Sequence, residues 1–339
     1  MSLIDKHLQD KLISYLKINY RNLGTIRNLE LITHNNINSI NYLIYSAKGT
    51  YVLRNFCDNS DIKKMEKICN ILNFCACKGA KVFRIIKNNS GIYVDKKRKM
   101  YLTKYYDGGI YSGSNIEIKN LAKSLAFLHK ELSKTHLKYN YRPRQRCYYL
   151  LNSSELKNVR KIIRGQKDMQ SRIVFRHLTV ISKLLASSHY FLEHIKDSNL
   201  KKQLIHYDLH PGNVIFYRKN VSAIIDFNLM RKGVLIEDVA YACFRFSSYN
   251  VYTTQEILKK MTLFIQTYLQ YNSVDKREIR FFDQYLMRVI LGNLSCVIRQ
   301  KFLRGNNEWD ADIEKFINFA LLLHKISFKL RIEIKNLIS

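Results

Sequence analysis

The sequence contains little proline and little glycine, with 2 Pro and 12 Gly in 339 residues. Together with a hydrophobic content of 47%, this excludes a disordered or low-complexity chain and indicates a globular, helix-rich protein. No apolar run approaches the roughly 20 residues that a membrane-spanning helix requires. Residues 1–12 also lack the apolar segment of a signal peptide. We therefore expect a cytoplasmic protein with no membrane contact.

The cysteines lack the spacing of a metal site or of a disulfide framework. There are seven, an odd number, and none forms a C-x-x-C pair. Cys75 and Cys77 are the closest pair, and no His or Cys motif accompanies them. We therefore expect the cysteines of this chain to act as small apolar side chains rather than as metal ligands.

Acidic residues are scarce, since 27 Asp and Glu stand against 57 Lys and Arg, for a net charge of +30. A charge of this size can indicate binding to nucleic acid. The basic residues are spread along the chain, however, and Lys, Asn, Ile and Tyr are all abundant. We therefore interpret the charge as compositional and expect no nucleic-acid partner. The cluster of Arg142, Arg144 and Arg146 is the place where an anion could bind.

One stretch carries most of the chemical signal, residues 204–227, with the sequence LIHYDLHPGNVIFYRKNVSAIIDF. Two apolar runs around a polar turn predict a β-hairpin at 214–225. Asp208 and Asn213, on the preceding loop, have the D-x-x-x-x-N spacing of a kinase catalytic loop, and Asp226 follows the hairpin as the kinase metal-binding Asp does. Phosphoryl transfer needs a carboxylate beside the attacking hydroxyl and oxygen ligands for Mg²⁺.

The full string H-x-D-L-H-x-G-N-V, followed by I-D-F, resembles the aminoglycoside phosphotransferase and choline kinase-like family, which includes homoserine kinases of one class. The resemblance implies an α+β, bilobal, protein-kinase-like fold with an antiparallel-sheet N-lobe at residues 1–105 and a mostly helical C-lobe at 106–339. It implies an ATP- and Mg²⁺-dependent small-molecule kinase with an alcohol group as acceptor. No A-P-E motif follows Asp226, which argues against a protein kinase.

The resemblance also implies roles for the motif residues. Asp208 would orient the acceptor hydroxyl and act as its base. Asn213 and Asp226 would hold Mg²⁺. His206 and His210 would support the loop by hydrogen bonds, and a histidine acting as the base is the alternative within this site.

Further positions follow from the same resemblance. Ser39 and Asn41 would lie near the nucleotide phosphates, although the turn beside them contains no glycine. Arg54 takes the place of the kinase strand Lys, and Glu66 in the next helix would pair with it. Backbone groups around Tyr105 would form the hinge that hydrogen-bonds adenine.

The C-terminal region is expected to be helical. Asp238, in the string E-D-V-A, resembles the D-L-A string of the family and would support the catalytic loop. Strands are expected at 29–32, 42–45, 51–56, 81–86, 92–94 and 100–106, and helices at 1–20, 61–78, 116–133, 174–196, 253–271, 276–303 and 310–335.

The acceptor is left open among homoserine-, sugar-, choline- and aminoglycoside-like alcohols. Cationic acceptors bind preferentially in acidic or aromatic pockets. Few acidic residues cluster after residue 227, which favours a neutral or zwitterionic alcohol as the acceptor. An acidic pocket could still be built from the carboxylates of Glu237, Asp238, Glu308, Asp310 and Asp312. The alternative function is a non-catalytic, kinase-like binding protein of the spore-coat type.

Overall fold

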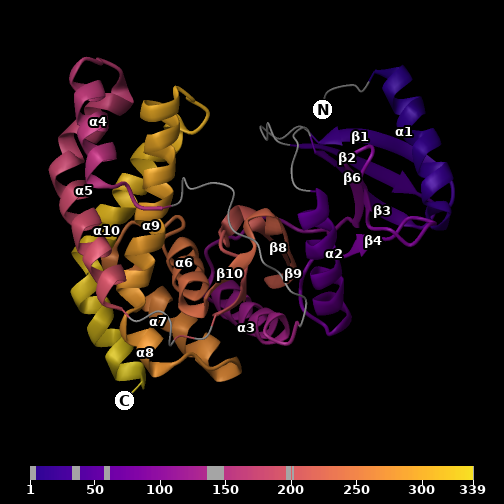
Figure 1. Cartoon of the computed structure of the whole chain (residues 1–339). Coiled ribbons are helices and arrows are strands. Elements are labelled where there is room, and N and C mark those ends of the chain that lie inside the picture. The colour runs from indigo at the N-terminus through magenta and orange to yellow at the C-terminus, as the bar shows by residue number, and fades with distance from the viewer. Residues whose placement is uncertain are drawn as a thin grey trace.

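The computed structural model describes residues 5–32, 39–56, 62–135, 149–195, 200 and 202–338. Figure 1 shows two parts, a sheet near the N-terminus in indigo and purple and a larger helical part that ends at the C-terminus. Short strands and the helix α3 lie between them. This arrangement confirms the predicted α+β class, with an antiparallel sheet first and a mostly helical part after it.

Six strands form the N-terminal sheet, in the order β1-β2-β3-β6-β4, with β5 also paired to β6. Every neighbouring pair is antiparallel. The strands are β1 (Ile26–Ile32), β2 (Ser39–Ser46), β3 (Gly49–Phe56), β4 (Ile85–Ile86), β5 (Val94–Asp95) and β6 (Met100–Lys104). The first three strands form the predicted meander, and each is longer than the sequence predicts.

The two faces of this sheet differ in chemistry, as the alternation of side chains along a strand requires. Leu53 of β3 packs in an apolar cluster with Leu16 of α1 (Lys6–Asn19). Its neighbours Val52 and Arg54 line a cavity on the opposite face. A slip of one residue would exchange the two faces. The packing against α1 therefore fixes which side chains of β3 reach the cavity.

The strand predicted at 81–86 is divided between the two parts of the molecule. Only Ile85–Ile86 pairs with the sheet. Before it, Phe83 donates its N–H to the carbonyl of Ile224 (3.2 Å), and Ile224 donates its N–H to the carbonyl of Lys81 (2.7 Å). The prediction of a single strand is therefore wrong, because the two halves of the segment have different pairing partners. The contact with Ile224 ties the sheet to the helical part.

One apolar core continues from the sheet into the helical part. Ile68 and Leu72 of α2 (Ile62–Cys77) belong to the same cluster of buried side chains as Leu125 of α3 (Asn115–Leu132). The sequence predicts both helices to within one residue of these bounds, because each has a clear apolar stripe at helical spacing.

The linker between β6 and α3 is attached to the following hairpin at Gly109. Gly109 exchanges two backbone hydrogen bonds with Phe216, both 2.9 Å long. Gly108 has φ +147°, and a Cβ atom at this position would clash with the carbonyl oxygen of Phe216. Glycine is therefore required at position 108 both by the backbone conformation and by the close approach of the hairpin.

We expect Gly108→Ala to lower the free energy of unfolding by about 2 kcal/mol or more, because the added Cβ forces the linker away from the hairpin. Gly109→Ala is the matched control, since its Cβ would meet nothing within 4 Å. Urea denaturation of both variants measures the difference. Equal stability of the two variants would contradict this reading of the linker.

Two short strand pairs surround the motif loop. β8 (Val214–Tyr217) and β9 (Asn220–Ile224) form the predicted hairpin, and β7 (Lys202–Ile205) pairs antiparallel with β10 (Arg231–Val234). The loop at 206–213 connects β7 to β8. The sequence does not predict β10, whose pairing with β7 holds the start of the loop.

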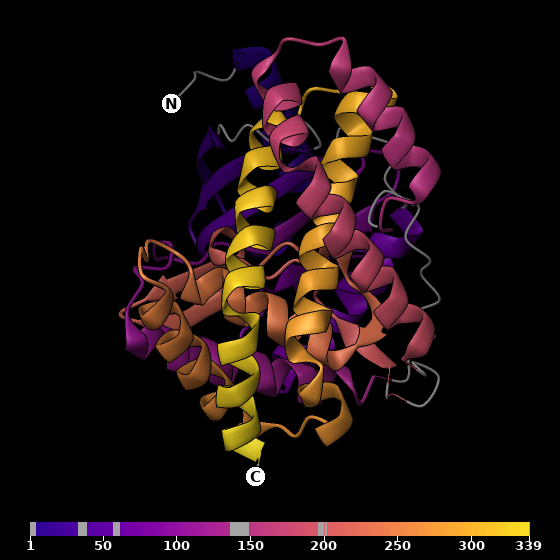
Figure 2. The same ribbon diagram turned by 90° about the vertical axis from the view of Figure 1, so that its left-hand side faces the viewer.

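Seven helices follow or flank these strands: α4 (Ser153–Arg164), α5 (Met169–His194), α6 (Leu235–Ser247), α7 (Thr254–Tyr271), α8 (Lys276–Arg280), α9 (Phe282–Ile298) and α10 (Asp310–Ile338). Figure 2 shows α5, α9 and α10 as long neighbouring helices. The helix predicted at 276–303 is interrupted at Phe281, whose φ of −105° and ψ of 21° leave the helical region. The sequence analysis does not predict α4.

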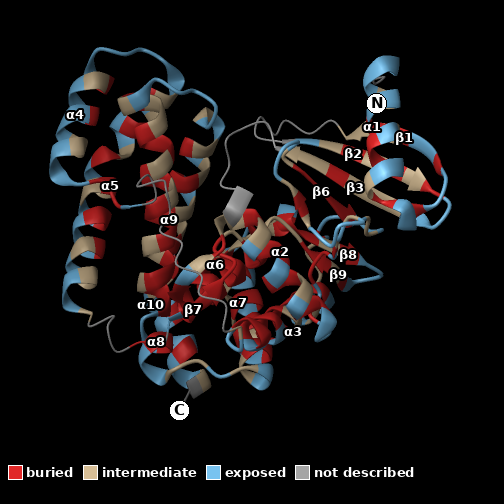
Figure 3. Ribbon diagram, turned by 45° about the vertical axis from the view of Figure 1, so that its right-hand side comes forward, coloured by how far each residue is buried: buried red, intermediate tan, exposed pale blue. Residues whose placement is uncertain are grey.

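The helices of this part differ in burial. Figure 3 shows mostly buried residues on α6 and mostly exposed residues on α4. Arg245 is the only residue of α6 that is not buried. The helix α6 is therefore the centre of the helical part. None of the described helices is both long and apolar enough to cross a membrane.

Candidate active site

The structure brings together the base and the two metal ligands that the sequence predicts. Asp208 and Asn213 lie on the loop between β7 and β8, and Asp226 follows β9. The Asn213 side chain donates from Nδ2 to the carbonyl of Asp208 (2.8 Å). Its own carbonyl accepts the N–H of Ile225, the residue before Asp226, at 2.9 Å. Asn213 therefore connects the two segments that carry the carboxylates.

Asp238 holds the start of this loop, as the sequence predicts. Its side chain is fully buried on α6. Oδ2 accepts the N–H of His206 (2.8 Å), and Oδ1 accepts the N–H of Tyr207 (2.7 Å), whose φ of 70° turns the chain toward Asp208. Burial opposes the charged form of Asp238, but the hydrogen bonds from His129 and His206 outweigh it and lower its pKa.

A chain of buried side chains extends behind Asp238. His129 of α3 donates from Nε2 to Asp238 Oδ2 (3.0 Å). Its Nδ1 therefore accepts from the hydroxyl of Tyr268 on α7 (2.7 Å), and the Tyr268 oxygen accepts from Asn272 (2.9 Å). The tautomer of His129 follows from these partners. The network joins three helices behind the motif loop, and through it Asp238 and His129 hold the start of this loop.

The two loop histidines are neutral and hydrogen-bonded. His206 donates from Nε2 to the carbonyl of Ile225 (2.9 Å) and accepts the N–H of Asp208 at Nδ1 (3.2 Å). Burial lowers its pKa. His210 accepts the N–H of Gly212 at Nδ1 (3.1 Å), and burial, followed by the charge of Arg245, lowers its pKa to about 3. Both nitrogens of His206 are occupied, which argues against His206 as the base.

Asp208 has the environment of a general base. Its side chain keeps an exposed fraction of 31%. Burial, followed by the charge of Asp226, raises its pKa to about 7, while the cations Arg245 and Lys315 oppose the rise. A base whose pKa lies near neutral pH is partly deprotonated at that pH and still binds a proton strongly enough to accept it.

The residues present fit a divalent cation. Asn213 uses its side-chain nitrogen for the Asp208 carbonyl, which leaves Oδ1 as an oxygen ligand beside the Asp226 carboxylate. Asp226 adopts a left-handed backbone (φ 59°, ψ 66°), an uncommon conformation that often marks functional positions. The described residues hold no group of three or more His, Cys, Asp or Glu that could bind a metal ion by themselves. The set therefore suits Mg²⁺, which takes one or two protein ligands plus phosphate oxygens.

A cavity of about 430 Å³ lies between the sheet and this loop. Asn41 and Arg54 line it from the sheet, Tyr105 from the linker, and Asn213 and Asp226 from the helical part. The structure thus brings five of the predicted site residues to one cavity, which agrees with a nucleotide site as the sequence analysis describes it.

Arg54 is placed by its neighbours across the sheet. Asn41, Arg54 and Tyr101 are successive cross-strand partners on β2, β3 and β6. Arg54 hydrogen-bonds Tyr101, and although burial opposes its charge, Tyr101 and Asp226 raise its pKa. Its guanidinium is therefore held as a cation at the cavity that Asn213 and Asp226 also line.

Glu66 does not form its predicted pair. Its carboxylate lies 2.8 Å from Nζ of Lys96, in the turn between β5 and β6. Arg54 instead hydrogen-bonds Tyr101 on the cavity face. The prediction of a Glu66–Arg54 pair is therefore wrong, because the Glu66 carboxylate pairs with Lys96 from the neighbouring turn.

Two predicted features lie outside the described residues, the turn at 33–38 and the cluster of Arg142, Arg144 and Arg146. Ser39, the first residue of β2, borders that turn, and its backbone is paired with Phe56. Its place near the nucleotide phosphates stays a prediction.

A group of cations that the sequence does not predict supports the loop. Arg231 donates to Glu237 at 2.8 Å, and Arg288 also pairs with this buried carboxylate. The Arg231 guanidinium lies 3.4 Å from the ring centroid of Tyr207. These contacts join β10, α6 and α9 to the residue next to Asp208. No local pattern in the sequence marks them.

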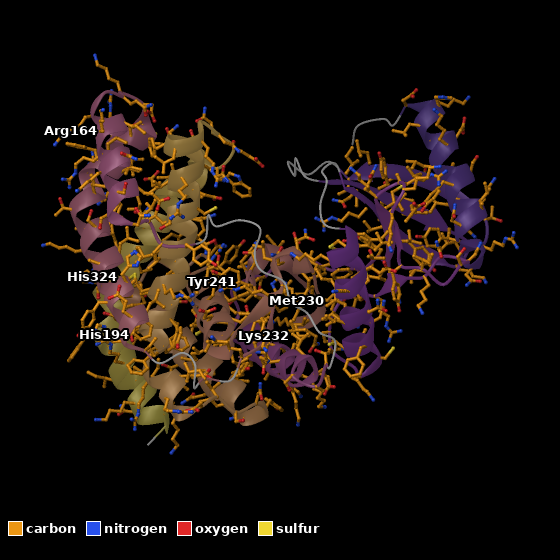
Figure 4. The ribbon with its side chains drawn as sticks, viewed as in Figure 1. Arg164, His194, Met230, Lys232, Tyr241 and His324 are labelled. Atoms are coloured by element: carbon orange, nitrogen blue, oxygen red, sulfur yellow. The ribbon has the colours of Figure 1, made fainter. Side chains whose placement is uncertain are left out.

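A larger cavity, of about 530 Å³, lies among α5, α9 and α10. His194 and His324 line it, and Figure 4 shows them at the outer edge of the helical part, far from Tyr241 at the centre. None of the predicted site residues lines this cavity. Size alone therefore does not identify the active site, whereas the converging side chains of Asn213 and Asp226 do.

Comparisons with known proteins identify the family and the fold of the chain. The sequence profile of the phosphotransferase enzyme family matches residues 28–282. No curated protein sequence shows significant similarity to the chain. A spectinomycin phosphotransferase, solved with ADP and spectinomycin, is 15% identical with a TM-score of 0.68, over 96% of this chain and 98% of that chain. A choline kinase from Streptococcus pneumoniae is 13% identical with a TM-score of 0.59, over 94% and 100%. An ethanolamine kinase from Plasmodium vivax is 16% identical with a TM-score of 0.57, over 97% and 91%.

These similarities bear on different levels. The solved structures are only 13–16% identical to the chain, so their structural similarity establishes the shared fold and nothing further. The family profile spans more than half of the chain, including the motif loop, the hairpin and Asp238. The chain therefore belongs to the phosphotransferase enzyme family, as the H-x-D-L-H-x-G-N-V string indicates, and is a small-molecule phosphotransferase.

Proposed function

We propose that the protein transfers the γ-phosphoryl group of ATP to a hydroxyl group of a small molecule, with Mg²⁺ as the required metal. The observation that carries the proposal is the convergence of Asp208, Asn213 and Asp226 beside one cavity. Asp238 and the buried network behind it fix this arrangement. Preorganised polar groups of this kind are the main contribution of a protein to phosphoryl transfer.

ATP would bind in the cavity of about 430 Å³. Phe83 and Ile225 give it apolar walls that suit a planar base. Arg54 would lie beside the phosphates. Residues 1–105 would then act as the lobe that covers the nucleotide, and residues 106–339 as the lobe that supplies the catalytic loop and the acceptor pocket.

Asp208 would carry out the proton step. The acceptor oxygen attacks the γ-phosphorus, the bond from this phosphorus to the bridging oxygen of ADP breaks, and the hydroxyl proton passes to the Asp208 carboxylate. Asn213 and Asp226 would hold Mg²⁺, which would neutralise charge on the phosphates when bound. Direct transfer to the acceptor needs no covalent intermediate on the protein.

The contents of similar structures support the nucleotide and the metal. One is an amicoumacin kinase with AMP-PNP and Ca²⁺, and another is a spectinomycin phosphotransferase with ADP. Both contain a nucleotide, and one contains a divalent cation. In this chain, the cavity would bind the nucleotide and the Asn213–Asp226 pair would bind the divalent cation.

A melting assay tests the proposal. We expect ATP to raise Tm only when Mg²⁺ is present, because ligand at about 100 times Kd stabilises a protein by about 2.7 kcal/mol. Asp226→Asn should abolish the Mg²⁺-dependent part of the shift, since it removes the charged metal ligand. Asp10→Asn, an exposed carboxylate on α1, is the control and should respond like the wild type. An equal shift in Asp226→Asn and in the wild type would contradict the assignment of Asp226.

A further inference from the structure

Two cations that do not line the cavity of about 430 Å³, Arg245 and Lys315, act on Asp208 through their charges. Starting from the proposed function, on which this inference rests, we propose that the acceptor alcohol carries an anionic group, a carboxylate or a phosphate, and that Arg245 and Lys315 bind it. The alcohols considered from sequence alone are neutral, zwitterionic or cationic. The structure narrows this choice through the side chains that surround Asp208.

Arg245 is connected to the catalytic loop through Tyr241. Tyr241 is fully buried and packs in one cluster with Tyr207, the residue before Asp208. The Arg245 guanidinium hydrogen-bonds the Tyr241 hydroxyl and lies 5.3 Å from the Tyr241 ring centroid. It also lies 5.4 Å from the ring centroid of Phe319 on α10. Two rings and a hydroxyl therefore hold this cation in place, so little side-chain entropy is lost when it binds a ligand.

Lys315 approaches the same place from α10. Its Nζ lies 4.8 Å from the ring centroid of Phe316, and the rings of Phe316 and Phe319 are in edge contact with centroids 6.1 Å apart. Arg245 and Lys315 thus border one aromatic group. Their charges both act on Asp208. The structure therefore offers two cations near Asp208, one on α6 and one on α10.

Arg245 is not paired with a carboxylate in the part of the chain that the structure describes. No carboxylate among the described residues lies within ion-pair distance of its guanidinium, whereas Lys315 pairs with Asp312 and keeps an exposed fraction of 38%. A guanidinium that is partly buried, fixed and not neutralised is a site for a carboxylate or phosphate group, which it can bind through two parallel hydrogen bonds.

Four of the five carboxylates that the sequence offers for a cationic acceptor are engaged elsewhere. Glu237 pairs with Arg231 and Arg288, and Asp310 pairs with Lys301 at 2.6 Å. Asp238 and Asp312 also have partners, as described above. Of the acids that the sequence offers for an acidic pocket, these four are therefore already neutralised or hydrogen-bonded.

Arg245 and Lys315 also lie outside the proposed nucleotide site. Neither Arg245 nor Lys315 lines the cavity of about 430 Å³, whose cation beside Asp226 is Arg54. Binding of the donor phosphates is therefore assigned to Arg54, and binding of the acceptor to Arg245 and Lys315. Kinetics can distinguish the two roles, because loss of Arg54 should raise KM for ATP and loss of Arg245 or Lys315 should raise KM for the acceptor.

The test compares the wild type with Arg245→Gln and Lys315→Met. Lys325→Met is the matched control, an exposed lysine on the same helix as Lys315. Hydroxy acids, sugar phosphates, neutral sugars, choline and an aminoglycoside are added to the protein with AMP-PNP and Mg²⁺, and Tm is measured. We expect stabilisation by hydroxy acids or by sugar phosphates, and which of the two stabilises identifies the anion. Apparent affinity should fall about 10- to 100-fold in each test variant and stay unchanged in the control.

Three results would overturn the inference. These are stabilisation by cationic or neutral alcohols only, stabilisation by no member of the panel, or an anion effect that Arg245→Gln and Lys315→Met leave unchanged. The response to AMP-PNP and Mg²⁺ alone keeps this test separate from the proposed function. If that response is present and anionic alcohols do not bind, the inference fails and the kinase assignment stands. If that response is absent, the kinase assignment itself fails.

Discussion

Asp208→Asn is expected to lower kcat for phosphoryl transfer by about 100- to 10,000-fold, the usual contribution of a general base. The variant should remain folded. The hydrogen bonds of Asp208 to the loop use its backbone, with its N–H on His206 and its carbonyl on Asn213. The substitution therefore removes the proton acceptor and leaves the loop in place.

The stability of this variant provides its control. Burial raises the pKa of Asp208, so the folded state disfavours the charged carboxylate at neutral pH. Replacing it with a neutral amide should leave Tm unchanged or raise it, and the Tm shift with ATP and Mg²⁺ should match that of the wild type. Loss of activity together with a lower Tm would instead indicate a structural role for the Asp208 carboxylate.

Asp238→Asn is expected to lower the free energy of unfolding by about 3 kcal/mol or more and to lower activity through the loop. The carboxylate of Asp238 accepts three hydrogen bonds, from His206, Tyr207 and His129. An amide nitrogen in place of one oxygen would face N–H donors, which leaves buried groups unsatisfied. Asp10→Asn, an exposed carboxylate on α1, should change stability by less than about 0.5 kcal/mol.

The effect of Asp238→Asn should depend on pH. The folded pKa of Asp238 is lowered, so its stabilising contribution is complete above the ordinary Asp pKa of about 3.9 and is lost as pH falls through the lower folded value. The difference in unfolding free energy between the wild type and Asp238→Asn should therefore narrow below about pH 4. A difference that stays constant across this range would contradict the charged state assigned to Asp238.

The motif loop and hairpin could be predicted because their signals are local. The spacing of Asp208, Asn213 and Asp226 lies within one short stretch, and the turn between β8 and β9 is marked by polar residues. The meander of β1 to β3 and the helices α2 and α3 also follow from local periodicity. These elements position the cavity and one side of the site.

The remaining features depend on contacts between distant residues. Glu66 pairs with Lys96 rather than Arg54, and nothing in the local sequence distinguishes these two cations. The strand β10 is recognisable only through its pairing with β7. The helix α4 is a different case, because Asn152 and Glu155 form a capping box that the sequence contains. That signal was available before the structure.

The two cations proposed to bind the acceptor also could not be predicted from local sequence. Arg245 and Lys315 are 70 residues apart in the sequence, and two among 57 basic residues do not stand out in a chain of net charge +30. Only the packing of α6 against α10 through Phe319 brings them close to each other. A charge that is spread along the sequence is thus locally concentrated where the acceptor would bind.

The most direct test of the central claim is transfer of phosphate from ATP, read by mass spectrometry. The acceptor panel holds homoserine, hydroxy acids, sugars, sugar phosphates, choline, ethanolamine and several aminoglycosides, with Mg²⁺ present and Asp208→Asn run in parallel. We predict an acceptor that gains one phosphoryl group with the wild type and fails to do so with the variant. Equal product from both proteins, or no product together with no binding of ATP and Mg²⁺, would contradict a phosphotransferase that uses Asp208, and the second result would favour a non-catalytic binding protein of the same fold.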